Sequence, residues 1–289
     1  MMVILGVVLV TALAFGGYAY SGGSMEVMMH ALPYEFTMVA GMSVLAFIIS
    51  NSMSVVKRSG GAIGRAVKGP KWKAGDYRDL LVLMNGLAQE YRRAGINGLE
   101  PHIEKPDGST LFQKFPRISD DHEARELIVD TFRLVMMQMD DPMEAEDIIN
   151  RKIDAHHEHV HAPANALNAM ADALPAIGIV AAVLGVIKTM ASVDKPPEIL
   201  GGMIGGALVG TFLGVYLAYC VVQPVAMRII QIEDSDAAFS SVIRDVILSI
   251  MKGHPPPVCI EIGRGNIPPE FRPSFDAVED SLRAPAMAA

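Results

Sequence analysis

The sequence predicts an all-α fold, that of a polytopic membrane protein with four transmembrane helices and a helical cytoplasmic domain. Four runs contain no charged side chain, and the mean hydropathy of the chain is positive. A helix needs about 20 mainly apolar residues to cross a membrane. Between the second and third runs, apolar residues recur at helical spacing among charged ones, which is typical of a water-exposed helical domain. The runs are 1–20, 36–56, 173–187 and 199–227.

The first run, residues 1–20, is expected to cross the membrane. A cleaved signal peptide is the weaker alternative, because the run has no basic n-region and no A-x-A site before Ser21. The segment from Ser21 to Pro33 contains no Lys or Arg and is expected to be an outer loop. The second span is then predicted from Phe36 to Val56.

A cluster of basic residues after the second span indicates the orientation. It has six Lys or Arg and no acid between residues 57 and 73, which marks the inner side of the membrane. Both termini are therefore expected in the cytoplasm. The net charge of −8 comes largely from acids further along, between residues 120 and 147, so the chain does not resemble a nucleic-acid-binding protein. The basic residues are Lys57, Arg58, Arg65, Lys68, Lys71 and Lys73.

Three helices are predicted between the second and third spans. Apolar residues at helical spacing from Leu80 to Tyr91 predict the first, which Gly95 and Gly98 are expected to end. A second is expected at 123–139 and a third from Pro142, a helix-starting proline, toward the third span.

A further helix is expected to follow the fourth span, while the proline-rich tail from Pro255 is expected to be irregular. The predicted division of the chain has four parts. Two are membrane segments (1–56 and 168–227), and two are cytoplasmic, a helical domain (57–167) and a C-terminal helix with its tail (228–289).

The third and fourth spans contain no carboxylate and are rich in small residues. In the fourth span glycines repeat every four positions, a pattern that lets helices pack closely in lipid. Thr211 lies at mid-depth, where its hydroxyl can bond its own helix or line a wet path. Pro175 and Pro224 lie near the inner ends of these spans and are either static kinks or hinges. The repeating glycines, predicted to pack helices, are Gly202, Gly206, Gly210 and Gly214.

Several classes of chemistry find no support. There is no phosphate-binding G-x-x-x-x-G-K, no dinucleotide-binding G-x-G-x-x-G after a strand and no hydrolase G-x-S-x-G. We therefore expect no enzymatic activity and no cofactor. The only cluster with metal-ligand character is a histidine-rich run, which we interpret as a polar segment, because only Glu158 is there to complete a ligand set. It contains His156, His157, His159 and His161.

The chain resembles the MotA family of bacterial flagellar stators over nearly its whole length. The order of several motifs carries this resemblance, although each motif alone is weak. They include Phe15-Gly16-Gly17-Tyr18, Ala164-Asn165-Ala166-Leu167, Asp172 through Pro175 to Val183, Val209-Gly210-Thr211-Phe212-Leu213-Gly214, Phe115-Pro116-Arg117-Ile118 and Arg272-Pro273-Ser274-Phe275.

The resemblance implies a torque generator of the bacterial inner membrane that is driven by ion flux. A homopentamer of this subunit would surround two copies of MotB, a single-span partner that supplies a membrane aspartate. Thr211 and Ala182 would face that aspartate, and Pro175 and Pro224 would couple its protonation to movement. Sodium-using relatives carry an additional hydroxyl where this chain has Ala182, so protons are expected.

The resemblance also implies that Arg92 and Glu100 contact the rotor switch protein FliG. The alternative is that both are solvated surface residues, with Glu100 in a loop after Gly98.

Two other functions remain open. A TolQ/ExbB-like energy-transducing subunit would have three spans, whereas this chain has a further N-terminal one. A self-contained ion-coupled transporter would carry its own ionisable residue inside the membrane. No ionisable residue is expected in the four spans, so a transporter of this kind would have to use Asp172 at the inner end of the third span.

Overall fold

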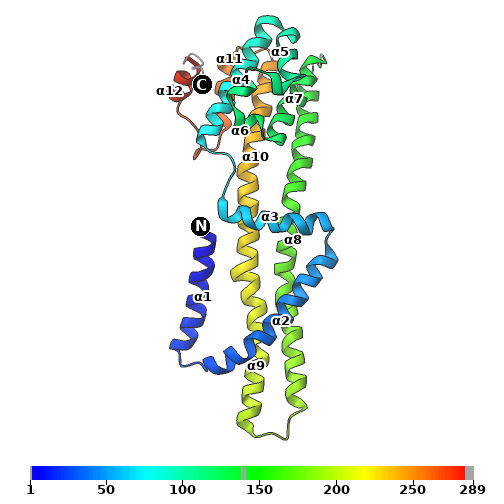
Figure 1. The fold of residues 1–289 in the computed structure, drawn as a ribbon, viewed down its shortest axis with the longest axis vertical. Coiled ribbons are helices and arrows are strands. Elements are labelled where there is room, and N and C mark those ends of the chain that lie inside the picture. The colour runs from blue at the N-terminus through cyan, green and yellow to red at the C-terminus, as the bar shows by residue number, and fades with distance from the viewer. Residues whose placement is uncertain (1, 138, 140, 284–289) are drawn as a thin grey trace. The chain divides into compact units, whose positions relative to one another are not determined.

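The computed structural model describes residues 2–137, 139 and 141–283, and every regular element in them is a helix (Figure 1). They form two compact units. The membrane unit contains Met1–Gly69 and Val160–Ile232, and the globular unit contains Pro70–His159 and Glu233–Ala289. The predicted all-α class is therefore confirmed.

Four helical stretches are long and apolar enough to cross a membrane. They are α1 (Met2–Tyr20), α2 (Met25–Ser50), α8 (Pro142–Met190), and α9 (Pro197–Tyr216), which continues through the π-helical segment η3 (Leu217–Val222) into α10 (Gln223–Met251). The predicted number of spans is therefore confirmed. The helices expected from Pro142 and at 173–187 are one continuous helix, α8.

The predicted limits of the second span are wrong. Helix α2 begins at Met25, where the Ser24 side chain accepts a hydrogen bond from the Val27 amide at 3.4 Å. The expected outer loop from Ser21 to Pro33 therefore shrinks to residues 21–24. Pro33 lies inside the helix because a membrane helix tolerates proline where neighbouring groups satisfy the freed backbone.

The basic residues after α2 belong to a separate helix, α3 (Met53–Lys68), which runs crosswise to α8 in Figure 1. Its alanines Ala62 and Ala66 pack against α8 and α10, while Lys57, Arg65 and Lys68 remain exposed. One apolar and one basic face are typical of a helix that lies at a membrane surface.

Helices α8 and α9 approach each other through small residues on both sides. A Cβ on Gly178 would lie 2.8 Å from the Gly210 carbonyl oxygen, and a Cβ on Gly214 would lie 2.7 Å from the Leu174 carbonyl oxygen. Real Cβ atoms do not come this close to backbone, so both positions require glycine. The helices are antiparallel, because only residues 191–196 connect them.

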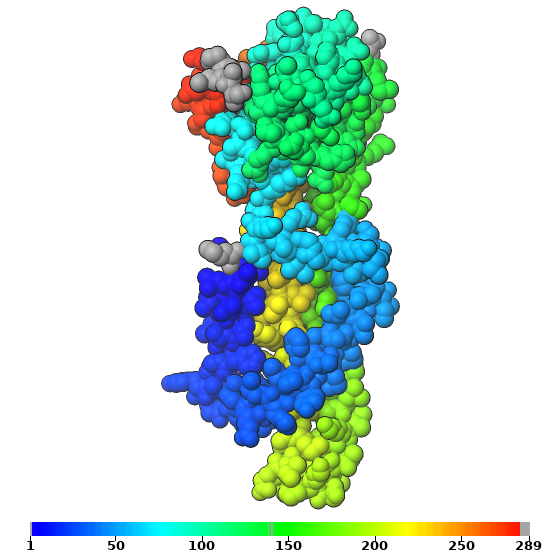
Figure 2. All heavy atoms as spheres, viewed as in Figure 1, coloured from blue at the N-terminus to red at the C-terminus, as the bar shows by residue number. Residues whose placement is uncertain are grey.

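Helix α1 has no buried residue, and its dark-blue side chains lie at the surface in Figure 2. It contacts α9 through the Phe15 ring, whose centroid lies 5.8 Å from that of Phe212 and 6.1 Å from that of Tyr216. The Thr11 hydroxyl also bonds the Tyr216 hydroxyl. In lipid such an apolar outer helix needs few protein contacts.

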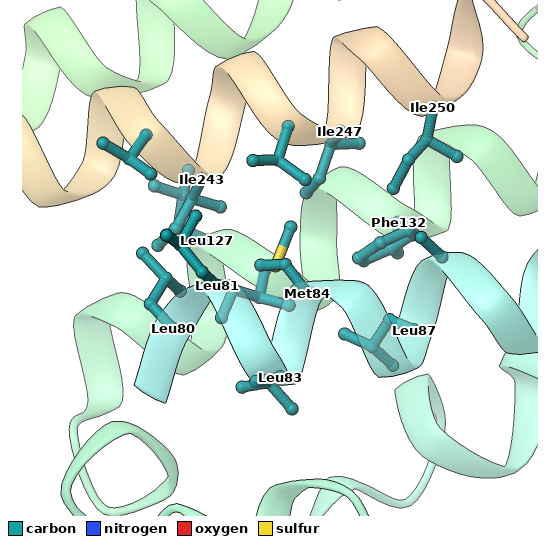
Figure 3. Close-up of a cluster of buried hydrophobic side chains, with 14 of the residues drawn as sticks. Leu80, Leu81, Leu83, Met84, Leu87, Leu127, Phe132, Ile243, Ile247 and Ile250 are labelled. Atoms are coloured by element: carbon teal, nitrogen blue, oxygen red, sulfur yellow. The ribbon is translucent and has the colours of Figure 1, made fainter. Parts of the chain in front are cut away.

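The globular unit is built on a core between α4 (Ala74–Ala94), α7 (His122–Met136) and α10. Figure 3 shows apolar side chains from these helices pointing toward one another. Helix α4 confirms the helix predicted from Leu80 to Tyr91, and α7 ends at Met136, before the predicted Met139. The labelled core residues are Leu80, Leu81, Leu83, Met84, Leu87, Leu127, Phe132, Ile243, Ile247 and Ile250.

After α4 the chain turns sharply into α5 (Ile96–Ile103) at Gly95, whose φ of +61° favours glycine. Gly98 does not end a helix as predicted, because it lies inside α5. Its missing side chain lets α5 pass the Glu90 carbonyl oxygen, with which a Cβ would collide. The connection to α7 consists of short turns, η1 (Pro106–Gly108), η2 (Phe112–Lys114) and α6 (Pro116–Ser119).

The expected irregular tail is wrong, because it contains α11 (Pro256–Asn266) and α12 (Phe275–Arg283). Pro256 occupies the first turn of α11, where its missing N–H costs no hydrogen bond. Cys259 and Ile260 are buried in the core, and burial raises the pKa of the Cys259 thiol. The prolines at the start of the tail, which suggested an irregular segment, therefore begin helix α11.

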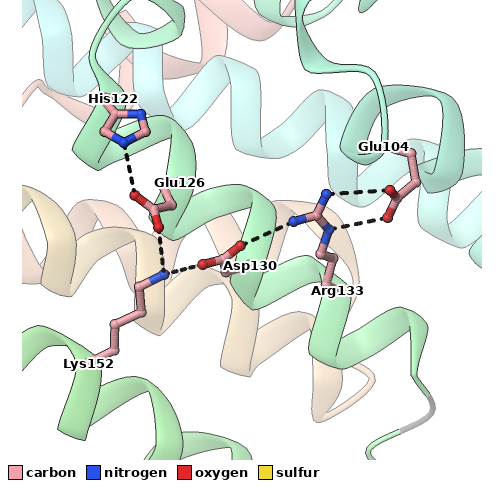
Figure 4. Close-up of polar contacts among 6 residues, drawn as sticks. All are labelled: Glu104, His122, Glu126, Asp130, Arg133 and Lys152. Carbon is pink, nitrogen blue, oxygen red and sulfur yellow. Dashed lines mark hydrogen bonds and ion pairs between the residues drawn. The ribbon is translucent and has the colours of Figure 1, made fainter.

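A chain of ion pairs joins Glu104, the residue directly after α5, to α7 and α8 on the surface of the globular unit (Figure 4). Arg133 pairs with Glu104 at 3.2 Å and with Asp130 at 3.4 Å, and Lys152 pairs with Asp130. Exposed pairs stabilise a fold by about 0–1 kcal/mol each, so the apolar core contributes more.

We expect Gly178→Ala and Gly214→Ala to separate α8 from α9 and to destabilise the protein by about 1–3 kcal/mol each, the usual cost of overpacking. Thermal unfolding in detergent, followed by size-exclusion chromatography, measures the effect. Gly201→Ala is the matched control, because a Cβ there meets nothing within 4 Å. Equal unfolding temperatures for all three variants would contradict the close approach.

We also expect acid to destabilise the globular unit through His102. Burial lowers the pKa of His102, whose Nδ1 lies 2.7 Å from the Ser109 hydroxyl. The unfolded chain then binds this proton more readily, so the stabilisation is present above the ordinary pKa of about 6.5 and is lost as pH falls. His102→Gln should weaken the fall in unfolding temperature below neutral pH, and the exposed-site variant His122→Gln should not.

Candidate functional site

The close pair of α8 and α9 places two predicted site residues on one face. Ala181 lies beside Gly210 at the contact between the helices. The next residue along each helix is turned by about 100°, and on antiparallel neighbours both turns lead to the same side of the pair. Ala182 and Thr211 therefore share one face, which we call the threonine face.

The Thr211 hydroxyl is available on this face. Thr211 is half-buried, and within the described residues its hydroxyl makes no hydrogen bond. Several other hydroxyls in the membrane unit donate to their own helix, as Thr189 does to the Gly185 carbonyl at 3.0 Å and Ser43 to the Val39 carbonyl at 2.6 Å. The Thr211 hydroxyl therefore does not bond a carbonyl of its own helix, which was the alternative interpretation.

Exposed apolar side chains surround Thr211 and Ala182 on the threonine face. Their exposure means that neither α1 nor α2 of the same chain covers them, so lipid or another helix must do so. No carboxylate occurs in 174–187 or 199–227. The exposed residues include Ile179, Val183, Val186, Ile204, Leu208 and Val215.

The opposite face of the pair is covered by α2 and carries an acid that sequence reasoning missed. Glu35 lies well inside α2, is only 6% exposed, and its carboxylate rests where a Cβ of Gly210 would be. The expectation that the spans hold no ionisable residue is therefore wrong. A charge-free span can begin only after Glu35, whereas Ser24 followed by helix-favouring residues indicates an earlier helix start.

The four repeating glycines have different surroundings. Gly214 meets α8, and Gly210 leaves room for the Glu35 carboxylate. Gly206 faces Ala31 of α2, with 3.5 Å between its missing Cβ and that side chain, while a Cβ on Gly202 would meet nothing within 4 Å. Close packing against α8 thus involves Gly210 and Gly214, the last two glycines of the pattern.

The two predicted coupling prolines occupy different backbone settings. Pro175 lies inside α8 directly after Leu174, whose carbonyl faces Gly214. Pro224 follows η3, where the helix widens to the π form, a local change common near functional sites. Pro224 also lines a cavity of about 510 Å³ with residues of α1, α3 and α10.

The predicted rotor-contact residues lie close together in the chain at the α4–α5 corner. Arg92 is in the last turn of α4 and Glu100 is on α5, not in the expected loop. Both are exposed, and neither makes an ion pair within the described part of the chain. The adjacent Arg93, in contrast, pairs with Glu90 at 2.6 Å.

Part of the histidine-rich run lies beside acids of the globular unit. His156 is 3.5 Å from Glu123 of α7, and His157 is 3.1 Å from Asp234 of α10. These contacts fit the interpretation of a polar, solvated segment.

Comparison with known proteins gives consistent results over the whole chain. Residues 4–95 match the family described as Motility protein A N-terminal, and residues 120–235 match the MotA/TolQ/ExbB proton channel family. Motility protein A of Salmonella typhimurium is 35% identical over 284 residues, 98% of this chain and 96% of that protein. Chemotaxis protein LafT of Vibrio parahaemolyticus is 31% identical over 96% of this chain and 97% of its own length.

Two solved structures share the fold. MotAB from C. jejuni superimposes with a TM-score of 0.72 at 20% identity and covers 95% of this chain and 98% of its own. The flagellar MotAB stator complex from Bacillus subtilis has a TM-score of 0.67 at 21% identity, with coverages of 96% and 97%. The four spans agree with the 35% identity to a motility protein A over nearly the full length, and the chain belongs to the motility protein A (MotA) family.

Proposed function

We propose that this chain is a stator subunit of a bacterial flagellar motor, which conducts protons with MotB across the inner membrane and turns the flux into torque. The observation that carries the proposal is the threonine face, where a free hydroxyl lies among exposed apolar side chains beside a tightly packed helix pair. The face offers a polar contact but no group that can carry a proton. A partner must supply that group.

MotB is the natural source of this group, because the solved relatives are complexes of an A and a B subunit. A single-span helix from MotB would cover the apolar residues around Thr211 and bring its aspartate to the hydroxyl. Several copies of this chain would surround it, and we propose a homopentamer.

The proposed orientation places both termini and the globular unit in the cytoplasm. The exposed basic residues of α3 support it, since they suit the inner surface of a membrane. The short α8–α9 turn (191–196) then lies outside.

Energy conversion would follow from charge movement past the threonine face. One charge that crosses 100 mV releases about 2.3 kcal/mol. Protonation of the partner's aspartate removes a charge beside α9, and Pro175 with the π-helical segment before Pro224 marks where the two helices bend most readily. We expect no enzymatic chemistry in this chain.

Torque would reach the rotor through Arg92 and Glu100. Both lack an ion-pair partner within the described residues, so both are available to charges on FliG. The strength of such a contact between exposed charges depends on the charge of each residue and on the salt concentration.

The function is tested by rotation of tethered cells that lack their own stators and express this chain with its MotB. We expect rotation whose speed stays the same when external sodium is replaced by potassium and that stops when the proton gradient is collapsed. Thr211→Val should abolish rotation because it removes the hydroxyl at nearly constant volume.

Thr211→Ser is the matched control, because it keeps the hydroxyl and should keep most of the rotation. Full speed with Thr211→Val, at normal protein level, would show that the hydroxyl is not part of the ion path. If rotation requires sodium, then sodium is the coupling ion and the proposal of protons is wrong.

The rotor contact predicts a loss of torque in Arg92→Ala/Glu100→Ala. Exposed charges contribute about 0–1 kcal/mol each, so the loss of both removes about 1 kcal/mol in total, and speed under load should fall roughly five-fold while the number of stators in the membrane stays unchanged. Bead assays measure speed, and a fluorescent fusion counts stators. The matched control is Arg78→Ala/Asp79→Ala, which removes an exposed pair from the opposite end of α4. Equal speeds in both double variants would contradict the contact.

A further inference from the structure

The Glu35 carboxylate occupies a place that only glycine on the facing helix allows. Its side chain is buried between α2 and α9, and a Cβ on Gly210 would collide with its carboxylate oxygen Oε2. Gly210 therefore does more than bring α8 and α9 together, since its bare backbone makes room for an acid.

This carboxylate accepts no hydrogen bond from the residues that the structure describes. In the part of the chain that the structure describes, the buried oxygen Oε2 has no hydrogen-bond partner. The Thr37 hydroxyl on the same helix, in contrast, donates to the Pro33 carbonyl at 2.7 Å. A buried carboxylate that is ionised and unpartnered is strongly disfavoured, so a proton or water must compensate it.

A cavity beside Glu35 can hold that water. Its volume is about 900 Å³, and it is lined by α2, α8 and α9. Water occupies a cavity that is large enough and has polar groups to bond, and several side chains that line this cavity are polar. From α2 come the titratable groups Glu26, His30 and Tyr34, and from α8 comes Lys188, while the α9 residues in its wall carry no titratable group.

The cavity opens toward the α8–α9 turn. Lys188 and Thr189 lie in the last turn of α8, and Ile199 lies in the first turn of α9. Glu26, His30 and Lys188 are exposed, whereas Glu35 is buried at the inner end of this polar series. In the orientation proposed above, the turn lies outside, so external water has access to the cavity.

We propose that this cavity is a proton-binding site open to the external solution, with Glu35 as the acceptor, and that its protonation adds an external-pH dependence to stator output. A hydrated proton enters through the cavity, one carboxylate oxygen takes the proton, and a water molecule is released. Lys188 on α8 is the cation facing the ionised form. The site lies on the opposite side of α9 from Thr211, so it is separate from the threonine face. The effect on output rests on the proposed stator function.

The first experiment compares motor speeds over a range of external pH, from about 6 to about 8.5, with internal pH held constant. Glu35→Gln imitates the protonated, neutral carboxyl at every pH. Its speed should equal the wild-type speed at the acid end and differ from it by about two-fold at the alkaline end. A ratio of the two speeds that is constant with pH would overturn the effect on output.

Glu198→Gln is the matched control, because Glu198 is an exposed acid in the first turn of α9 that does not line the cavity. It should follow the wild-type profile at every pH. A wild type that fails to rotate would contradict the stator function instead, and the site is then tested by the second measurement.

The second measurement is infrared spectroscopy of the purified complex of this chain with its MotB. A carbonyl band of a protonated carboxyl group should change with bulk pH, disappear in Glu35→Gln and remain in Glu198→Gln. If Glu35→Gln does not assemble, Glu35→Asp should keep a titrating band at a shifted position. Absence of a band assigned to Glu35, or a band insensitive to pH, would overturn the proton-binding site.

Discussion

At Gly178 and Gly214 the backbones of α8 and α9 lie so close that neither position has room for a Cβ. Membrane helices have no hydrophobic drive to associate in lipid, so close packing through small residues must hold such a pair. The rest of the membrane unit depends on this contact. Because the two helices are antiparallel and in register at these glycines, each neighbouring residue is assigned to one of two faces.

The two faces carry different chemistry. One holds the buried Ala182 and the half-buried Thr211 among exposed apolar side chains, which suits a helix from another chain. The other is covered by α2 and encloses Glu35 beside a large cavity with several polar side chains in its wall. Gly210 serves both faces, since it contacts Ala181 of α8 and leaves room for the acid of α2. A change in charge on either face would therefore act on the same turn of α9.

The globular unit is organised differently, because a water-exposed domain can use the hydrophobic effect. Its core joins helices distant in the chain, α4, α7, α10 and α11. Two further polar contacts tie its first residues in place, since the Asp236 carboxylate accepts from the Lys71 amide at 2.8 Å and Arg117 pairs with Asp76 at 3.1 Å. A firmly held unit can present Arg92 and Glu100 as free charges at one corner.

The sequence by itself determined the class, the four spans, the orienting basic cluster and the family resemblance, because hydropathy, charge and residue order are local properties of the chain. It also indicated glycine packing in the fourth span. Only the tertiary structure decided which glycine meets which neighbour, that Glu35 is buried inside α2, and that the proline-rich tail is helical against the core. These outcomes depend on contacts between distant segments: burial opposite Gly210 keeps an acid inside an apolar helix, and burial of Cys259 and Ile260 stabilises a tail whose local sequence favours turns.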